Sequence, residues 1–174
     1  MKIGEPAPDF ALRGVDGGEH TLASYDGADV LVLIQSCNHC PYVIAWEERM
    51  MGVQADYADR GVRLVAVNSN DASRYPEDTF EKMTARAAQR GFNFDYLQDP
   101  EQMLVNALGA ERTPEVFVFD RDRRLVYHGA IDDNRDETAV TQQYLRAALD
   151  AALTGGKPAP AETQAVGCTV KWLQ

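Results

Sequence analysis

The chain has 174 residues, a formal net charge of −10 and 45% hydrophobic residues. A chain of this length and composition can bury the core of one globular domain. Its acidity argues against nucleic acid and anionic membrane surfaces, which attract basic proteins. No stretch approaches the roughly 20 apolar residues of a membrane span. We therefore expect a single domain over residues 1–174, with no nucleic-acid or membrane partner.

The N-terminal part predicts a β-hairpin followed by a buried strand. Residues 8–22 alternate between apolar and polar side chains, and Asp16-Gly17 supplies a turn. Residues 30–34 form a continuous apolar run rich in β-branched residues, which is typical of a strand buried on both faces. The first residues lack the apolar run of a signal peptide, so we expect a cytoplasmic protein.

The motif Cys37-Asn38-His39-Cys40-Pro41 follows this strand and precedes an amphipathic helix that Gly61 is placed to end. The positive end of a helix dipole stabilises a thiolate and lowers the pKa of a thiol there. We expect Cys37, the first cysteine, to be that nucleophile, and His39 to favour the thiolate further when protonated. The predicted chemistry is reversible dithiol–disulfide exchange, with no cofactor beyond the disulfide itself.

A C-x-x-C motif also occurs in zinc sites, which normally need a second pair of ligands. The remaining candidates are scattered: Cys168, His20 and His128. A metal-binding or metal-delivery module that uses Cys37, His39 and Cys40 is therefore an alternative, and we expect no resident metal.

The rest of the chain predicts alternating strands and helices. The expected elements are a strand at 62–67, a helix from Pro76 to Gly91, an extended segment at 92–97, a helix with Asp99 as N-cap that ends at Gly109, a hairpin of 116–119 with 125–128, a helix from about 136 to 153, and an extended tail at 154–174. This order predicts an α/β domain whose mixed central sheet carries helices on both faces.

Several motifs resemble the thioredoxin superfamily, and specifically its peroxiredoxin-like redoxin branch. The matching segments are Ala7-Pro8-Asp9-Phe10, the C-x-x-C motif, Thr113-Pro114, residues 129–133 and the closing Gly167-Cys168-Thr169-Val170-Lys171-Trp172. The segment from about 70 to 98 is similar to the insertion that separates redoxins from minimal thioredoxins. The resemblance implies a thioredoxin-like fold with an N-terminal hairpin and this insertion.

The resemblance also implies roles for the site residues. Cys37 would attack a disulfide and Cys40 would resolve the mixed disulfide. His39 matches a histidine associated with a more oxidising cysteine pair. Pro114 would be cis and pack against the disulfide, and Thr113 would offer its backbone to an extended substrate chain.

Two thioredoxin features are missing. Ser36 stands where thioredoxins carry an aromatic residue, and Leu31 stands where they carry a buried aspartate that handles the resolving cysteine's proton. Our candidate for the missing proton acceptor is Glu115, because burial beside Pro114 would raise its pKa into a useful range.

The peroxiredoxin comparison instead aligns Cys40 with the peroxide-reactive cysteine, which Cys37 would then resolve. Cys37 and Leu33 stand where peroxiredoxins carry a hydroxyl residue and a proline, which weakens this alternative. The third thiol, Cys168, is either a small apolar residue of a docked tail or an accessory thiol near the pair.

The sequence thus predicts a thiol–disulfide oxidoreductase. Its partners would be a protein or small-molecule disulfide, or a peroxide, and an upstream thiol reductant. A thiol peroxidase with an antioxidant role is the first alternative, and a homodimer is left open.

Overall fold

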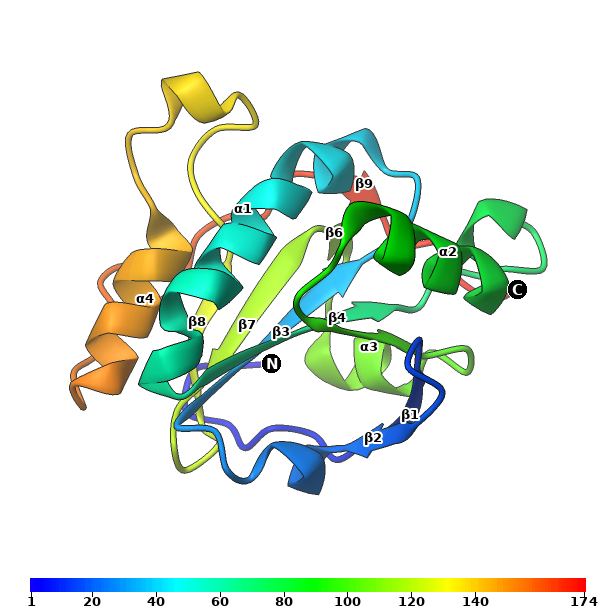
Figure 1. Ribbon diagram of the computed structural model, residues 1–174. Coiled ribbons are helices and arrows are strands. Elements are labelled where there is room, and N and C mark those ends of the chain that lie inside the picture. Colours follow the sequence, from blue (N-terminus) through cyan, green and yellow to red (C-terminus); the bar gives the residue numbers. More distant parts are fainter.

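The computed structural model describes residues 1–174, and a seven-stranded mixed sheet runs through its centre (Figure 1). Across the sheet the strand order is β2-β1-β5-β4-β3-β7-β8. The strands are β1 Ala11–Gly14, β2 Glu19–Thr21, β3 Val30–Ser36, β4 Val62–Asn68, β5 Asp95–Gln98, β7 Glu115–Phe119 and β8 Leu125–Gly129. β3 pairs in parallel with β4 and antiparallel with β7, which confirms the predicted mixed sheet.

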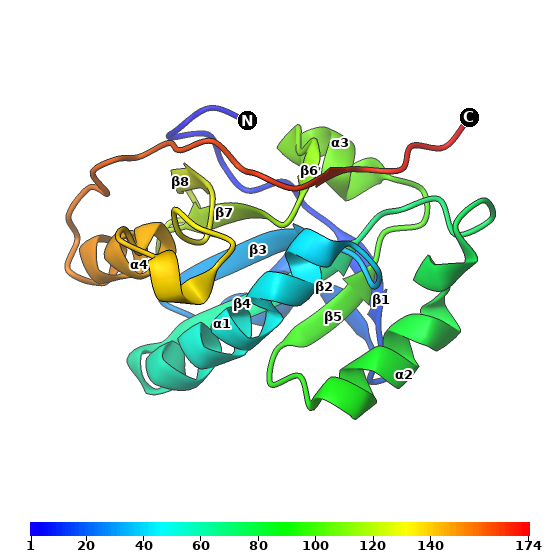
Figure 2. The ribbon, with the colours of Figure 1, turned by 90° about the horizontal axis from the view of Figure 1, so that it is seen from above.

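Helices cover both faces of this sheet, as the sequence predicted. They are α1 Pro41–Tyr57, α2 Phe80–Arg90, α3 Met103–Leu108 and α4 Tyr144–Leu153. α1, α2 and α4 lie on one face, and α3 lies on the other (Figures 1 and 2). The fold is therefore thioredoxin-like, with the N-terminal hairpin added at the β5 edge.

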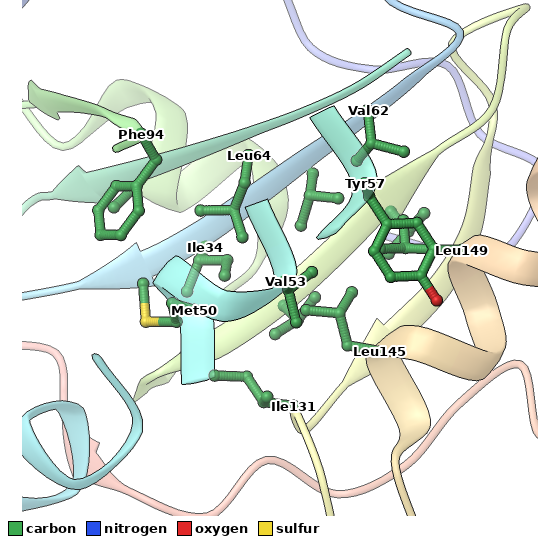
Figure 3. Close-up of a cluster of buried hydrophobic side chains, with 14 of the residues drawn as sticks. Ile34, Met50, Val53, Tyr57, Val62, Leu64, Phe94, Ile131, Leu145 and Leu149 are labelled. Atoms are coloured by element: carbon green, nitrogen blue, oxygen red, sulfur yellow. The ribbon is translucent and has the colours of Figure 1, made fainter. Parts of the chain in front are cut away.

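The central strand β3 contributes side chains to both hydrophobic cores because successive side chains point to opposite faces of the sheet. Ile34 and its even-numbered neighbours join a cluster of 20 buried residues under α1 and α4. Leu33 and its odd-numbered neighbours join a cluster of 15 on the α3 side. Figure 3 shows Met50 and Val53 of α1 and Leu145 of α4 over the first cluster. Burial on both faces fixes the strand that delivers the cysteine motif.

Three helix starts differ from the prediction. Pro76 opens only a short 3-10 turn, and Thr79 caps α2 with its side chain. Asp99 accepts hydrogen bonds from the first backbone N–H groups of α3, but the N-cap itself is Gln102, which has a positive φ. The last helix starts at Tyr144 rather than near 136, because residues 137–139 form a separate 3-10 turn and Val140 is extended.

The C-terminal tail crosses the molecule in an extended conformation, as expected (Figure 2). It runs beside β8, where the His128 backbone bonds to Ala161 and Thr163. Its short strand β9, Cys168–Thr169, then pairs antiparallel with β6, Arg112–Thr113. None of the helices has both the length and the apolar character needed to span a bilayer.

Candidate active site

The cysteine pair lies between the end of β3 and the start of α1. Helix α1 begins at Pro41, whose missing N–H costs nothing in the first turn, and Cys40 is the N-cap residue. Cys37 therefore precedes the helix by one further turn of chain. Both residues are buried, with 2% of Cys37 and 1% of Cys40 exposed. The helix start thus receives the second sulfur of the motif.

The two thiols of the motif lie in different surroundings. A hydrogen bond from Cys37 lowers the pKa of Cys40, and smaller contributions come from Cys168, the Val43 N–H and Thr113. The same hydrogen bond, together with burial and the charge of Asp78, raises the pKa of Cys37. The hydrogen bond from Cys37 thus favours the thiolate at Cys40, and the helix that begins there adds to this preference.

The Thr113–Pro114 segment packs beside both sulfurs. The peptide bond between these residues is cis, as the resemblance implied. Thr113 Oγ1 lies 3.7 Å from Cys37 Sγ, and the Thr113 carbonyl oxygen lies 3.4 Å from Cys40 Sγ. In this structure β9 of the chain's own tail pairs with the Thr113 backbone, which the resemblance assigned to an extended substrate chain.

His39 joins the motif to a buried carboxylate that sequence reasoning missed. His39 Nδ1 lies 2.9 Å from Asp78 Oδ2, and the ring stacks on Tyr75. The Asp78 carboxylate is buried and accepts three further hydrogen bonds, from the Asn38 backbone N–H (2.8 Å) and from the side chains of Asn68 (3.0 Å) and Asn70 (2.9 Å).

Asp78 gives this site the buried aspartate that its β3 position lacks. Cys37 Sγ, a His39 ring nitrogen and an Asp78 oxygen all lie within 4.8 Å of one another. The only indication of Asp78 in the sequence was an acidic residue inside the predicted insertion, 40 residues from Asn38. Its position beside the cysteine motif is seen only in the folded structure, where the insertion packs against the motif.

Glu115 is not the proton acceptor that the sequence suggested. Burial alone would raise its pKa, but hydrogen bonds from His128, Arg112 N–H and Glu111 N–H outweigh burial and lower the pKa. Both carboxylate oxygens are engaged: Oε1 lies 2.5 Å from His128 Nε2, and Oε2 accepts the two backbone N–H groups. Glu115 therefore holds the β6–β7 turn that carries Thr113.

Cys168 lies beside the pair, as the accessory-thiol hypothesis required. It packs against Cys37, Cys40 and Val43, and it is partly exposed. Burial and a hydrogen bond to Cys40 raise the pKa of Cys168 to about 11. All three cysteines are free thiols in this structure. The tail therefore completes a cluster of three thiols.

A mixed sheet of this order, with a cysteine pair at a helix start beside a cis-proline, defines a thioredoxin-like redox protein. The chain belongs to the Redoxin family, whose sequence model matches residues 2–145. The chain is 27% identical over 127 residues to a thiol-disulfide oxidoreductase ResA of Geobacillus thermodenitrificans, a match that covers 72% of this chain and 67% of that protein. The chain thus spans about two thirds of the curated relatives' length.

Solved structures agree with this assignment. A hypothetical protein SMc02350 from Sinorhizobium meliloti 1021 superposes with a TM-score of 0.94 at 39% identity, covering 99% of this chain and 96% of that one. A putative thiol:disulfide interchange protein DsbE from Chlorobium tepidum gives a TM-score of 0.59 at 26% identity, covering 74% and 84%. The near-complete overlap with the first structure includes the C-terminal tail.

Proposed function

We infer that this protein is an oxidoreductase that exchanges disulfides through Cys37 and Cys40. The observation that carries the inference is the placement of both sulfurs at the start of α1, beside Thr113 and its cis peptide bond to Pro114. Family membership and the ResA and DsbE relatives support the same reaction class. The lowered pKa of Cys40 and the raised pKa of Cys37 favour Cys40 as the attacking sulfur and Cys37 as the resolving one.

The reaction has two exchange steps. The Cys40 thiolate attacks one sulfur of a substrate disulfide, forms a mixed disulfide and releases the first substrate thiolate. Cys37 then loses its proton and attacks the Cys40 sulfur, which closes the Cys37–Cys40 disulfide and releases the second substrate thiolate. A thiol reductant returns the pair to its starting state.

The Asp78–His39 pair is suited to take the proton of Cys37. A ring nitrogen of His39, a carboxylate oxygen of Asp78 and the Cys37 sulfur all lie within 4.8 Å of one another. Asp78 is held in place by three hydrogen-bond donors, and its Oδ2 lies 2.9 Å from His39 Nδ1, so a ring that takes up the proton forms an ion pair with it. We assign His39 and Asp78 to proton handling in the second step.

The substrate class that fits best is a small-molecule disulfide. Both reacting sulfurs are buried, and the Thr113 backbone is already paired with β9. Five surface cavities of about 320–540 Å³ have no cysteine in their lining. A protein disulfide would have to displace the tail before it could reach Cys40.

The test is turnover of hydroxyethyl disulfide with glutathione as the reductant. We expect Cys40→Ser to abolish turnover and Cys37→Ser to reduce it strongly, with Ser73→Ala, an exposed change remote from the sulfurs, as the control. Full turnover in Cys40→Ser would overturn the proposal.

Peroxide is the second candidate substrate, and the position of Cys40 favours it. A buried thiolate at the start of α1, beside a thiol able to resolve a sulfenic acid, matches the arrangement that peroxide reduction needs. Peroxide consumption by reduced protein at the rate of a free thiol would exclude this activity. An antioxidant role in the cell depends on that result.

Three further assignments belong to this proposal. We propose a cytoplasmic protein that needs no resident cofactor beyond its disulfide. We give metal delivery the lowest rank, because the Asp78 oxygens are already occupied by hydrogen-bond donors. Zinc or copper at one equivalent in protein purified under reducing conditions would reverse that ranking.

A further inference from the structure

The tail is anchored on both sides of Cys168. Before it, Gly167 approaches Thr113 so closely that an added Cβ would lie 2.1 Å from the Thr113 carbonyl oxygen. After it, Val170 is buried in the α3-side core, and its N–H donates to the Glu111 carbonyl (3.0 Å). Cys168 is therefore held at the site by packing and not by chance proximity.

The next residue extends this anchoring into the redoxin-type insertion. The Lys171 N–H donates to Asn70 Oδ1 (2.9 Å), and the Lys171 carbonyl accepts from the Asp71 N–H (2.9 Å) and from the Gln102 side chain (2.9 Å). Asn70 also donates to Asp78. The tail and the Cys37 side of the site thus share one hydrogen-bond network.

The three sulfurs differ in their access to solvent. Cys37 and Cys40 are almost fully buried, whereas Cys168 is partly exposed. In the register of β9 against β6, Cys168 lies opposite Thr113, the residue that contacts both sulfurs of the pair. A reductant approaching from solvent therefore meets Cys168 first.

We propose that Cys168 is a third redox-active thiol, which accepts a disulfide bond from the buried pair and presents it to an external thiol reductant. This inference rests on the proposed exchange reaction and names its reductive route. The partner is a thiolate that attacks at the tail strand, without entering the buried pair.

The chemistry balances in two steps. Cys168, after losing its proton, attacks Cys40 Sγ of the Cys37–Cys40 disulfide; the Cys40–Cys168 bond forms, and Cys37 leaves and takes up a proton. An external thiolate then attacks Cys168 Sγ, and Cys40 leaves as a thiolate. A second external thiol displaces Cys168, so that two reductant thiols become one disulfide and the protein regains its thiols.

The first step expels Cys37, the poorer leaving group, and the second step expels Cys40, the better one. Exchange is faster when the departing thiol has a low pKa, and the pKa of Cys40 is lowered by its neighbours. Attack by external thiolate at Cys168 therefore expels the best leaving group of the three.

The first test is cross-linking. Reduced Cys37→Ser protein is treated with one equivalent of diamide and its disulfides are mapped by peptide mass spectrometry. We expect an intramolecular Cys40–Cys168 disulfide in most chains, and none in Cys37→Ser/Cys168→Ser. Protein that instead forms only dimers, or keeps Cys168 free, would overturn the proposal.

The second test separates the relay from the exchange reaction itself. Oxidised Cys168→Ser should be reduced by glutathione at least tenfold more slowly than the wild type, while its reduced form still forms the Cys37–Cys40 disulfide when it is treated with hydroxyethyl disulfide. Thr169→Ser, the neighbouring exposed position on β9, is the control. An unchanged reduction rate in Cys168→Ser would contradict the relay and leave the exchange reaction of Cys37 and Cys40 standing. Loss of the reaction with hydroxyethyl disulfide in Cys168→Ser would also contradict the relay, because the relay concerns only the reduction of the oxidised protein.

Discussion

At the scale of single residues, the site depends on which cysteine stands at the N-cap of α1. Cys40 occupies the N-cap, and Cys37 supplies its S–H from one turn earlier. The spacing of a C-x-x-C motif does not show which cysteine stands at the helix start. Pro41 was the available signal, because proline is favoured at the first helical position and this places the N-cap at residue 40.

This arrangement predicts a thiolate that survives in acid. Thiolate absorbance at 240 nm in the reduced wild type should titrate well below the ordinary thiol value of about 8.5, and Cys40→Ser should lose this transition. Cys37→Ala should raise the midpoint by about one unit or more, because a hydrogen bond to a charged group contributes about 1.5–3 kcal/mol.

A wild-type midpoint near the ordinary value would contradict the assignment. So would an acid transition that persists in Cys40→Ser and is lost in Cys37→Ala, since the thiolate would then reside on Cys37.

We expect the substitution of Glu115 to affect the stability of the protein and not its catalysis. Glu115→Gln loses charged hydrogen bonds to two backbone N–H groups, so we expect a loss of about 1.5–3 kcal/mol in unfolding free energy at pH 6. Because the folded-state pKa is lowered, the stabilisation is present above the ordinary pKa of about 4.3 and disappears as pH falls through the folded value.

Urea unfolding at pH 6 and pH 3 measures this difference, which should shrink at the lower pH. Glu111→Gln, an exposed neighbour, is the matched control. Equal losses at both pH values would contradict the charge-based explanation, and a Glu115→Gln protein of normal stability that fails only in exchange would restore Glu115 as a proton acceptor.

At the scale of elements, the insertion and the tail complete a site that the minimal fold leaves open. The 3-10 turn at Pro76–Asp78 brings Asp78 to the C-x-x-C loop, and the tail brings Cys168 to Thr113. Both additions come from segments far from the motif in sequence.

The substitution Asp78→Asn tests whether the insertion contributes to the resolving step. The change keeps the shape and removes both the proton acceptor and the charge that raises the pKa of Cys37. We expect loss of the acceptor to outweigh the lower pKa, so that Cys37 resolves the mixed disulfide about tenfold more slowly at pH 7 and recovers as pH rises. Rapid quench of the glutathione adduct on Cys40 measures this step across pH. Loss of rate that is uniform across pH would indicate a merely structural contribution of Asp78.

Gly167→Ala tests the tail. The added Cβ would lie 2.1 Å from backbone oxygen, so the tail must lift from β6 and expose the pair. We expect Cys40 to react with a bulky aromatic disulfide at least tenfold faster than in the wild type. Gly156→Ala, where the nearest atom is 3.4 Å away, should leave the rate unchanged. An unchanged rate in Gly167→Ala would show that β9 does not limit access.

At the scale of the whole molecule, the sequence was most informative where hydrophobic patterns are local. The apolar run of β3 and the amphipathic stripe of α1 determine their own burial, so the sheet, its helices and the position of the motif could be predicted. The starts of α3 and α4 could not, because Gln102 and the turn at 137–139 respond to tertiary packing.

The features of the site also separate into those that the sequence predicts and those that depend on the folded chain. The motif, the cis-proline and the third thiol are visible in the sequence and its family resemblance. The Asp78 contact, the engagement of Glu115 and the pairing of β9 with Thr113 depend on segments brought together only by folding. Charge and burial decide the roles there, and neither follows from residue type alone.

The most direct measurement identifies the cysteine that carries substrate. Reduced Cys37→Ser/Cys168→Ser and Cys40→Ser/Cys168→Ser proteins, each with one remaining motif thiol, are mixed with oxidised glutathione, and the adduct is followed by mass spectrometry. We predict rapid, stoichiometric glutathionylation of Cys40 in the first protein and a reaction no faster than that of a free thiol in the second. Rapid adduct formation on Cys37 with an inert Cys40 would contradict the account.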